Sequence, residues 1–152
     1  MANNPLADQI LTHKFVAILN RKIPIANLMN ALGHMAAGMA GSAPTISEMR
    51  FDDYFDKDRG AHKSISDNGF IILQADNSNQ IRNVRKEALA TGIHFTDFTG
   101  TMTVGTYKEQ QARTKETPEA ELEYYGICMF GKINELQPLT KKFSLWKDKT
   151  QA

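Results

Sequence analysis

Three polar side chains, Asn27, Asn30 and His34, recur at three- and four-residue spacing just after an apolar run. On a helix this spacing places them on one face. An unperturbed histidine has a pKa of about 6.5, so His34 is a candidate general acid–base group near neutral pH. The sequence predicts a small polar ligand beside these residues. The alternative is a histidine hydrogen-bonded to the backbone in a helix that packs on a sheet.

A second polar group, Asp97 with Thr99, Thr101 and Thr103, ends a Thr- and Phe-rich stretch. Ligand crevices of open α/β sheets lie at the carboxyl ends of strands, so these hydroxyls are candidate ligand contacts and Asp97 is a candidate partner for His34. Alternating threonines are equally typical of a half-exposed strand, because β-branched residues suit strands.

Other reactive residue types lack a telling pattern. The four aspartates of residues 52–58 fail the EF-hand spacing because Gly60 comes one residue too early, and a solvated hairpin tip is the simpler interpretation. The four histidines show no metal-binding spacing, and no glycine-rich phosphate loop is present. Cys128 lies inside an apolar run, which favours packing over reactivity. We expect no metal and no cofactor.

Strand-sized apolar runs alternate with helical periods along the chain. In the first part of the chain we predict a strand at 14–19, a helix from Ile25 to Gly41, an edge hairpin at 50–55 and 61–65, a strand at 70–73 and a helix between Ser78 and Gly92. A strand at 93–106 follows, with a turn at Gly100, and then a polar insertion or lid at 107–123 with a helix start at Thr117. The last predicted elements are a strand at 125–130, a helix at 134–142 and a strand at 143–146.

This order predicts an α/β fold: a central mixed, mostly parallel sheet with helices on both faces. The first strand–helix–strand segment would place its two strands in parallel. In the first helix, the three- and four-residue spacing of Leu28, Leu32 and Met35 predicts that these side chains face the sheet, while Ala31 and His34 face away. All 152 residues form one domain in this interpretation, with its core at about 14–146 and no linker.

Composition limits the partners. The 152 residues carry 18 basic and 17 acidic side chains, a net charge of +1, so no global attraction to nucleic acid follows and tRNA binding would need a one-sided basic face. The single cysteine and the polar start, residues 1–9, predict a cytoplasmic protein. Apolar runs are too short for a membrane span. The small-residue helix and the hairpin offer close-approach surfaces, so we expect a homodimer.

Two stretches carry a family resemblance: the strand 14–19 with the helix segment 27–36, and the strand 125–131 with the helix and strand after it. In these stretches the chain resembles the type-2 peptidyl-tRNA hydrolase fold. It resembles more closely a bacterial family of unknown function, the domain-of-unknown-function family numbered two thousand. The resemblance covers residues 14–146 and implies that fold.

The departures from the hydrolase motif concern catalysis. If His34 aligns with the motif histidine, Asn27 stands at the lysine position and Ala31 at the glutamine position. The hydrolases also use an aspartate in a strand-end Asp-Ala-Gly-Arg-Thr stretch. Its nearest equivalent here is residues 97–101, where Asp97 is one residue out of register and the arginine is absent. A neutral amide cannot supply a lysine's charge. The alternative is that Lys22, in the loop before Pro24, swings in to replace the missing lysine. We therefore expect a ligand-binding protein without peptidyl-tRNA hydrolase activity. The alternatives are a hydrolase of altered chemistry using His34 and Asp97, and non-catalytic tRNA binding.

Overall fold

A computed structural model describes residues 11–148 of the chain. A five-stranded sheet forms its centre, in the order β5-β6-β1-β4-β7. The strands are β1 (His13–Asn20), β4 (Phe70–Ala75), β5 (His94–Thr99), β6 (Tyr124–Lys132) and β7 (Ser144–Leu145). The interpretation of residues 1–9 falls outside this described range. No helix within residues 11–148 is long and apolar enough to span a membrane.

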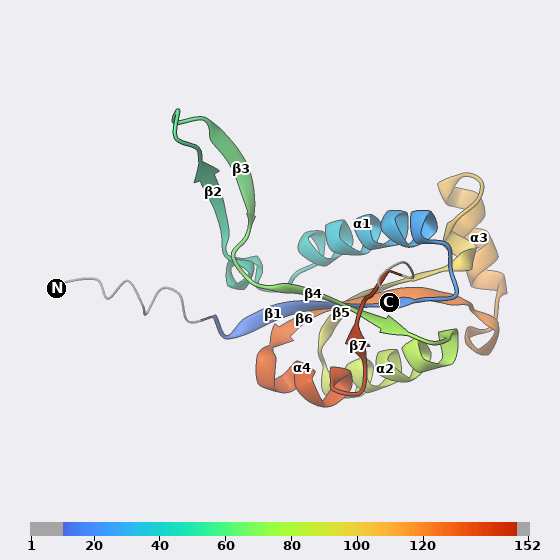
Figure 1. Ribbon diagram of the computed structural model, residues 1–152. Helices are drawn as coiled ribbons and strands as arrows, with labels where there is room; N and C mark the ends of the chain where they lie inside the picture. Colours follow the sequence, from blue (N-terminus) through green and yellow to red (C-terminus); the bar gives the residue numbers. More distant parts are fainter. Residues whose placement is uncertain (1–10, 149–152) are drawn as a thin grey trace.

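Helices cover both faces of the sheet, as predicted (Figure 1). Helix α1 (Ile25–Gly41) lies on one face, and α2 (Ser78–Thr91) and α4 (Ile133–Thr140) lie on the other. Strand β1 is central and buried on both faces, because Phe15, Ala17 and Leu19 pack toward α1 while Val16 and Ile18 pack toward α2 and α4. The fold is thus a three-layer α/β arrangement.

The sheet is mixed, but the prediction that it is mostly parallel was wrong. Only β1 and β4 pair in parallel, while β6 is antiparallel to both β1 and β5, and β7 is antiparallel to β4. The reason is the connection between β5 and β6. Residues 100–123 connect β5 to β6 at the same end of the sheet and do not cross its face, so β6 must run opposite to β5.

The helix α1 has the predicted bounds but a different rotation. Its buried residues are Leu28, Ala31, Met35 and Met39, whereas Met29 is exposed and Leu32 is only half buried. A small side chain at Ala31 lets the helix lie close to the sheet, and Gly126 of β6 does the same from below. A Cβ on Gly126 would lie 2.9 Å from Met35 Cε and 3.1 Å from the Ile18 carbonyl oxygen. The close approach of α1 to the sheet, rather than the burial of its largest apolar side chains, therefore sets which face of the helix is buried.

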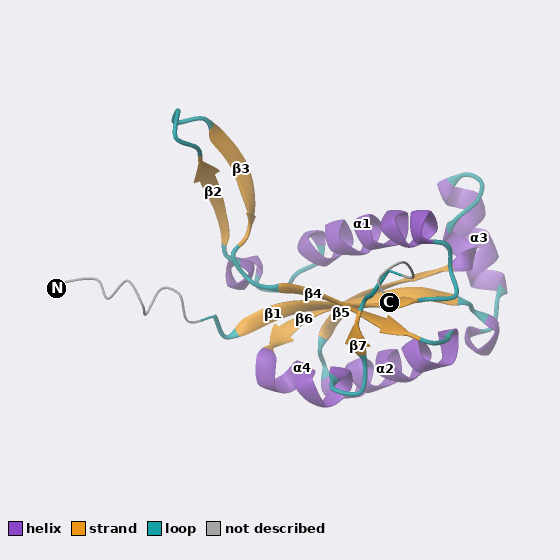
Figure 2. Ribbon diagram, viewed as in Figure 1, coloured by secondary structure: helices purple, strands orange, loops and turns teal. Residues whose placement is uncertain are grey.

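The hairpin exists but is not an edge of the main sheet. Strands β2 (Phe51–Phe55) and β3 (Ala61–Ser66) form a separate two-stranded sheet that projects away from the body (Figure 2). Its tip is organised by Asp56, whose Oδ1 accepts hydrogen bonds from the backbone N–H of Asp58 and Gly60, both at 2.9 Å. The hydrogen bond from Gly60, then that with His62, lowers the pKa of Asp56. The aspartates thus build a turn, as the simpler interpretation held.

The insertion differs most from prediction. Strand β5 ends at Thr99, not at residue 106, and a 3-10 turn (Gly100–Met102) follows. Helix α3 (Tyr107–Glu116) begins ten residues before the predicted start at Thr117. Thr106 and Glu109 form a capping box there, a Thr-x-x-Glu signature that the sequence contained. In α2, likewise, Asn77 rather than Ser78 is the N-cap, because its side chain accepts the hydrogen bond from Gln80 N.

Candidate functional site

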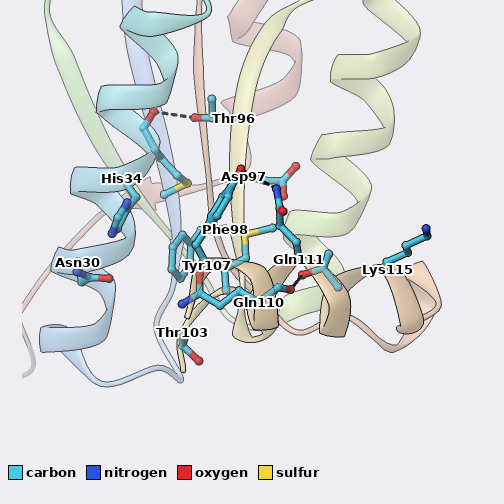
Figure 3. Close-up of a pocket in the computed structure, with 13 residues that line it drawn as sticks. Asn30, His34, Thr96, Asp97, Phe98, Thr103, Tyr107, Gln110, Gln111 and Lys115 are labelled. Atoms are coloured by element: carbon cyan, nitrogen blue, oxygen red, sulfur yellow. Dashed lines mark hydrogen bonds between the residues drawn. The ribbon is translucent and has the colours of Figure 1, made fainter. Parts of the chain in front are cut away.

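A cleft of about 1000 Å³ opens between α1, the end of β5 and α3 (Figure 3). We call it the α1–α3 cleft. Its apolar floor is formed by Met35, Phe98 and Met102, and polar side chains surround its mouth. The residues that line it are Asn30, His34, Met35, Thr96, Asp97, Phe98, Met102, Thr103, Tyr107, Gln110, Gln111, Thr114 and Lys115.

Helix α1 supplies Asn30 and His34, one turn apart, to one wall of the cleft. Both side chains are exposed, and neither makes a hydrogen bond to another described residue. The imidazole of His34 stacks on the Phe98 ring, with ring centroids 5.9 Å apart. The alternative of a histidine hydrogen-bonded to the backbone is therefore wrong. Both ring nitrogens are free to meet a ligand.

Asn27 lies one helical turn before Asn30 and lines a smaller hollow of about 230 Å³. This hollow shares Asn30, Phe98 and Thr103 with the cleft, so it extends the cleft toward the start of α1. The predicted grouping of Asn27, Asn30 and His34 is thus present along one side of the helix.

The opposite wall comes from α3. Tyr107 lies in its first turn, and its hydroxyl accepts a hydrogen bond of 2.7 Å from Gln111 Nε2. Gln110 Nε2 donates to the carbonyl oxygen of Gly105, which holds the entry to the helix with φ +87°. Glycine suits this residue because a side chain would be strained there, and a Cβ would lie 2.1 Å from Glu109 Oε2.

Hydrogen bonds tie this wall to the sheet. Arg113 donates to the carbonyl oxygens of Thr101 and Val104, at 3.1 and 3.0 Å. Thr114 Oγ1 donates to Thr101 Oγ1, which also lies 2.7 Å from Thr99 Oγ1. The predicted ligand contacts Thr99 and Thr101 therefore lie behind the cleft, where their hydroxyls fasten α3. Thr103, in contrast, lines the cleft.

Asp97 does not pair with His34. Its carboxylate accepts a hydrogen bond of 3.0 Å from Arg85 Nε of α2. Burial alone would lower the pKa of Arg85, but the hydrogen bond and charge of Asp97 raise it above its ordinary value. Neighbours along β5 point to opposite faces of the sheet, with Phe98 packed toward α1. The two predicted catalytic groups thus have partners on different faces of the sheet: His34 stacks on Phe98 on the α1 face, and Asp97 bonds to Arg85 of α2.

Lys22 lies in a different hollow, of about 530 Å³, with Arg21, Trp146 and Lys147. Its backbone N–H donates to Asn20 Oδ1 at 3.0 Å, which fixes the loop after β1. The lysine that lines the α1–α3 cleft is Lys115, in the last turn of α3. The sequence did not predict four of the residues that line the cleft: Lys115, Tyr107, Gln110 and Gln111. Recognising the capping box of Thr106 would have marked α3 as a helix and placed them on it.

The sequence model of the family described as protein of unknown function (DUF2000) matches residues 13–147. The chain belongs to the DUF2000 family. Among curated proteins, none matches it.

One solved structure, of a protein of unknown function from Agrobacterium tumefaciens, superposes with a TM-score of 0.78 at 14% sequence identity. The match covers 91% of this chain and 100% of the other. At this identity the likeness shows a shared α/β fold. This likeness carries no statement about function, which must be inferred from the chemistry of the α1–α3 cleft.

Proposed function

We propose that this protein binds a small polar ligand with an apolar body in the α1–α3 cleft, on a scaffold of the type-2 peptidyl-tRNA hydrolase kind, and that it does not hydrolyse peptidyl-tRNA. One observation carries the proposal. Within residues 11–148, His34 and Asn30 have no hydrogen-bond partner, and they lie at the mouth of a cleft whose floor is apolar. Ligand sites typically combine such a floor with a few polar groups that fix orientation.

The charges around the cleft indicate the ligand's character. The carboxylate of Asp97 is neutralised by Arg85, which leaves Lys115 and His34 as the ionisable side chains besides Tyr107. The carboxamides of Asn30, Gln110 and Gln111 both donate and accept hydrogen bonds. A neutral or singly anionic ligand that carries amide or hydroxyl groups suits this lining. A cation would find no free carboxylate among the residues that line the cleft.

The same residues argue against hydrolysis. A general base of the histidine type is usually oriented by a third group, and His34 has no carboxylate partner. Asn27 at the motif's lysine position brings no charge. Ala31, at the glutamine position, is fully buried against the sheet, so a side chain there would point away from the cleft. These features support binding without the motif's chemistry.

Ligand binding is tested by ligand-observed NMR with the full chain and a panel of small neutral amides, nucleosides and aromatic carboxylates. Asn30→Trp should fill the cleft and abolish saturation transfer to any hit. Asn83→Trp is the matched control, because Asn83 is an exposed asparagine on α2, away from the cleft. Hits that survive Asn30→Trp but not Asn83→Trp would contradict the proposed site, and a panel without hits in the unmodified protein would contradict the ligand class.

Hydrolysis is tested by a release assay with an acylated tRNA. Loss of one preorganised catalytic group typically lowers a rate by about 10²–10³, and here two motif positions are replaced. We expect no enzyme-like turnover from the unmodified protein. Robust turnover would refute this half of the proposal. If Lys22→Ala then abolished that turnover, the lysine of the neighbouring hollow would be the catalytic group.

A further inference from the structure

The hairpin arm, residues 51–66, exposes four large apolar side chains, those of Phe51, Tyr54, Phe55 and Ile65, each at least 42% exposed. It shares no strand pairing with the main sheet, and almost every residue in it is exposed. Isolated two-stranded hairpins are marginally stable in water. Both faces of the arm nevertheless carry apolar side chains. Phe51 and Phe55 lie on one face and Tyr54 on the other, since neighbouring side chains in a strand alternate. Ile65 lies on the face of Tyr54, because it pairs opposite Asp52.

The root of the arm is firmly held, in contrast to its length. Met49 is fully buried under α1, and its carbonyl oxygen accepts a hydrogen bond from Ser66 Oγ. Asn68 Nδ2 donates to the carbonyl oxygen of Glu48 at 3.0 Å, and Asp67 N donates to that of Arg50 at 2.9 Å. The body therefore fixes where the arm points. Such fixed projection of an uncovered hairpin is typical of an element that packs against another molecule.

A groove on the body has the matching apolar character. It lies between the first half of α1 and the β4–β7 edge, encloses about 130 Å³, and is lined only by apolar residues: Leu19, Ile25, Leu28, Met29, Leu32, Ile72 and Trp146. Met29 is 67% exposed at its rim. This second apolar stripe of α1 is what the rotation of the helix leaves uncovered.

The charges match as well. The groove shares Ile25 and Trp146 with the hollow that carries Arg21, Lys22 and Lys147, offset in part by Asp148 and by the partner of Arg21, Asp76. Strand β2 and the turn residue after it combine three aromatic residues, Phe51, Tyr54 and Phe55, with three acidic ones, Asp52, Asp53 and Asp56. The cations of the arm, Lys57, Arg59 and Lys63, lie in the turn and in β3. An aromatic and acidic strand thus complements an apolar groove bordered by cations.

The arm cannot reach the groove of its own chain. Its root follows the end of α1, whereas the groove lies along the first turns of this 17-residue helix. At 1.5 Å per residue the helix separates the two by about 25 Å. In Figure 1 the arm also points away from the body. A second copy with its α1 antiparallel would bring its groove next to the arm.

We infer that the hairpin arm of one copy docks into the apolar groove of a second copy, with Phe55 as its anchor, in a reciprocal two-fold dimer. Phe55 is 68% exposed and lies toward the tip of β2. Because a two-fold repeats each contact, one arm and one groove per chain close the assembly without free ends. Large aromatic anchors in pockets are typical hot spots of such interfaces.

Light scattering of the full chain at micromolar concentration tests this inference. The unmodified protein should have twice the 17.0 kDa chain mass. Phe55→Asp and Met29→Asp should each weaken dimerisation by at least about a hundredfold, because each dimer loses the side chain twice. Leu89→Asp, on the exposed face of α2, is the matched control and should leave the dimer intact. Circular dichroism checks that all variants fold.

Two mixing experiments decide which surfaces meet. A Phe55→Asp chain mixed with a Met29→Asp chain regains one intact arm–groove contact and should associate more strongly than either variant alone. Chains with Phe55→Cys and Met29→Cys should form a mixed disulfide, since the native Cys128 is fully buried and does not compete. A monomeric unmodified protein, a dimer insensitive to both aspartates, or preferred Phe55→Cys self-coupling would each overturn the inference.

Discussion

The two faces of the sheet both bury apolar cores, but they treat their polar side chains differently. On the face of α2 and α4, Arg82 donates to the carbonyl oxygens of Leu122 and Glu119, and Tyr124 donates to the Glu119 carboxylate at 3.2 Å. Burial raises the pKa of Tyr124 to about 12. Arg85 is bound to Asp97 on this side as well. The polar side chains named on this face therefore pair with other groups of the protein and stabilise the fold.

The α1 face leaves polar groups open. His34 and Asn30 have no hydrogen-bond partner among the described residues, and they border a cleft rather than a packed surface. Polar pairs exist on the α1 face as well, because Thr96 and His94 bond to carbonyl oxygens of α1. The candidate site is therefore marked by unpaired polar groups that border a cleft, not by unpaired polar groups alone. Asp97 illustrates the point, because its ion pair assigns it to the face of α2 although it is a neighbour of Phe98 in sequence.

The largest expected effect tests whether the core under the cleft is closed. Burial raises the pKa of the Cys128 thiol to about 12 from 9.0, so its thiolate fraction at pH 8 should be about 10³-fold below that of an unfolded chain. Labelling by a thiol reagent should slow at least that much in the native protein. Rapid labelling without denaturant would show that the α1 face opens.

The same shift has a sign for stability. The folded pKa is raised, so this contribution is complete below pH 9.0 and is lost as pH rises toward about 12. Cys128→Ala should flatten that alkaline loss relative to the unmodified protein, in urea titrations across this range. An unchanged alkaline slope would contradict the assignment.

Truncations in the two cores come next. Leu28→Ala on α1 and Ile81→Ala on α2 should each lower the free energy of unfolding by about 2–5 kcal/mol, because both side chains are fully buried and leave cavities. Met29→Ala, one residue along α1, should cost less than about 0.5 kcal/mol at protein concentrations too low for a dimer to form, because Met29 is exposed in the single chain. Chemical denaturation measures all three. Equal losses for Leu28→Ala and Met29→Ala would show that the rotation of α1 is wrong.

Breaking the ion pair should affect stability and spare binding. Arg85→Met keeps the aliphatic stem but leaves Asp97 without its donor, and we expect a loss of about 1–2 kcal/mol, since the carboxylate is partly buried. Affinity for a ligand of the cleft should stay within about twofold. A binding defect as large as that of His34→Ala would show that the Asp97 carboxylate acts on the ligand in the cleft and would revive the His34–Asp97 hypothesis.

The smallest stability effect is expected at the candidate site itself. His34→Ala and Asn30→Ala remove exposed side chains without hydrogen-bond partners, so each should change the free energy of unfolding by less than about 0.5 kcal/mol. Both should weaken binding in the NMR assay. A marked loss of stability would mean that these side chains hold the fold, and the contrast between the two faces would fail.

Much of the architecture was predictable because it depends on local pattern. The apolar run of β1 and the helical period of α1 have the predicted positions, and the parallel pairing of β1 with β4 follows from their helical connection. The sequence also predicted correctly that one side of α1 carries Asn27, Asn30 and His34, because helical spacing alone places them together. The helix α3 was missed although its capping box at Thr106 was present in the sequence.

Tertiary structure decided the rest. Sequence alone determined that the chain alternates strands and helices and that His34 lies on a helix beside the sheet. It could not determine that Ala31 rather than Leu32 faces the sheet, because that depends on the space that Gly126 opens across β6. Nor could it determine that Asp97 faces α2 while Thr96 and Phe98 face α1. The physical reason is that a strand sends neighbouring side chains to opposite faces, and only the helices packed there give each face its partners.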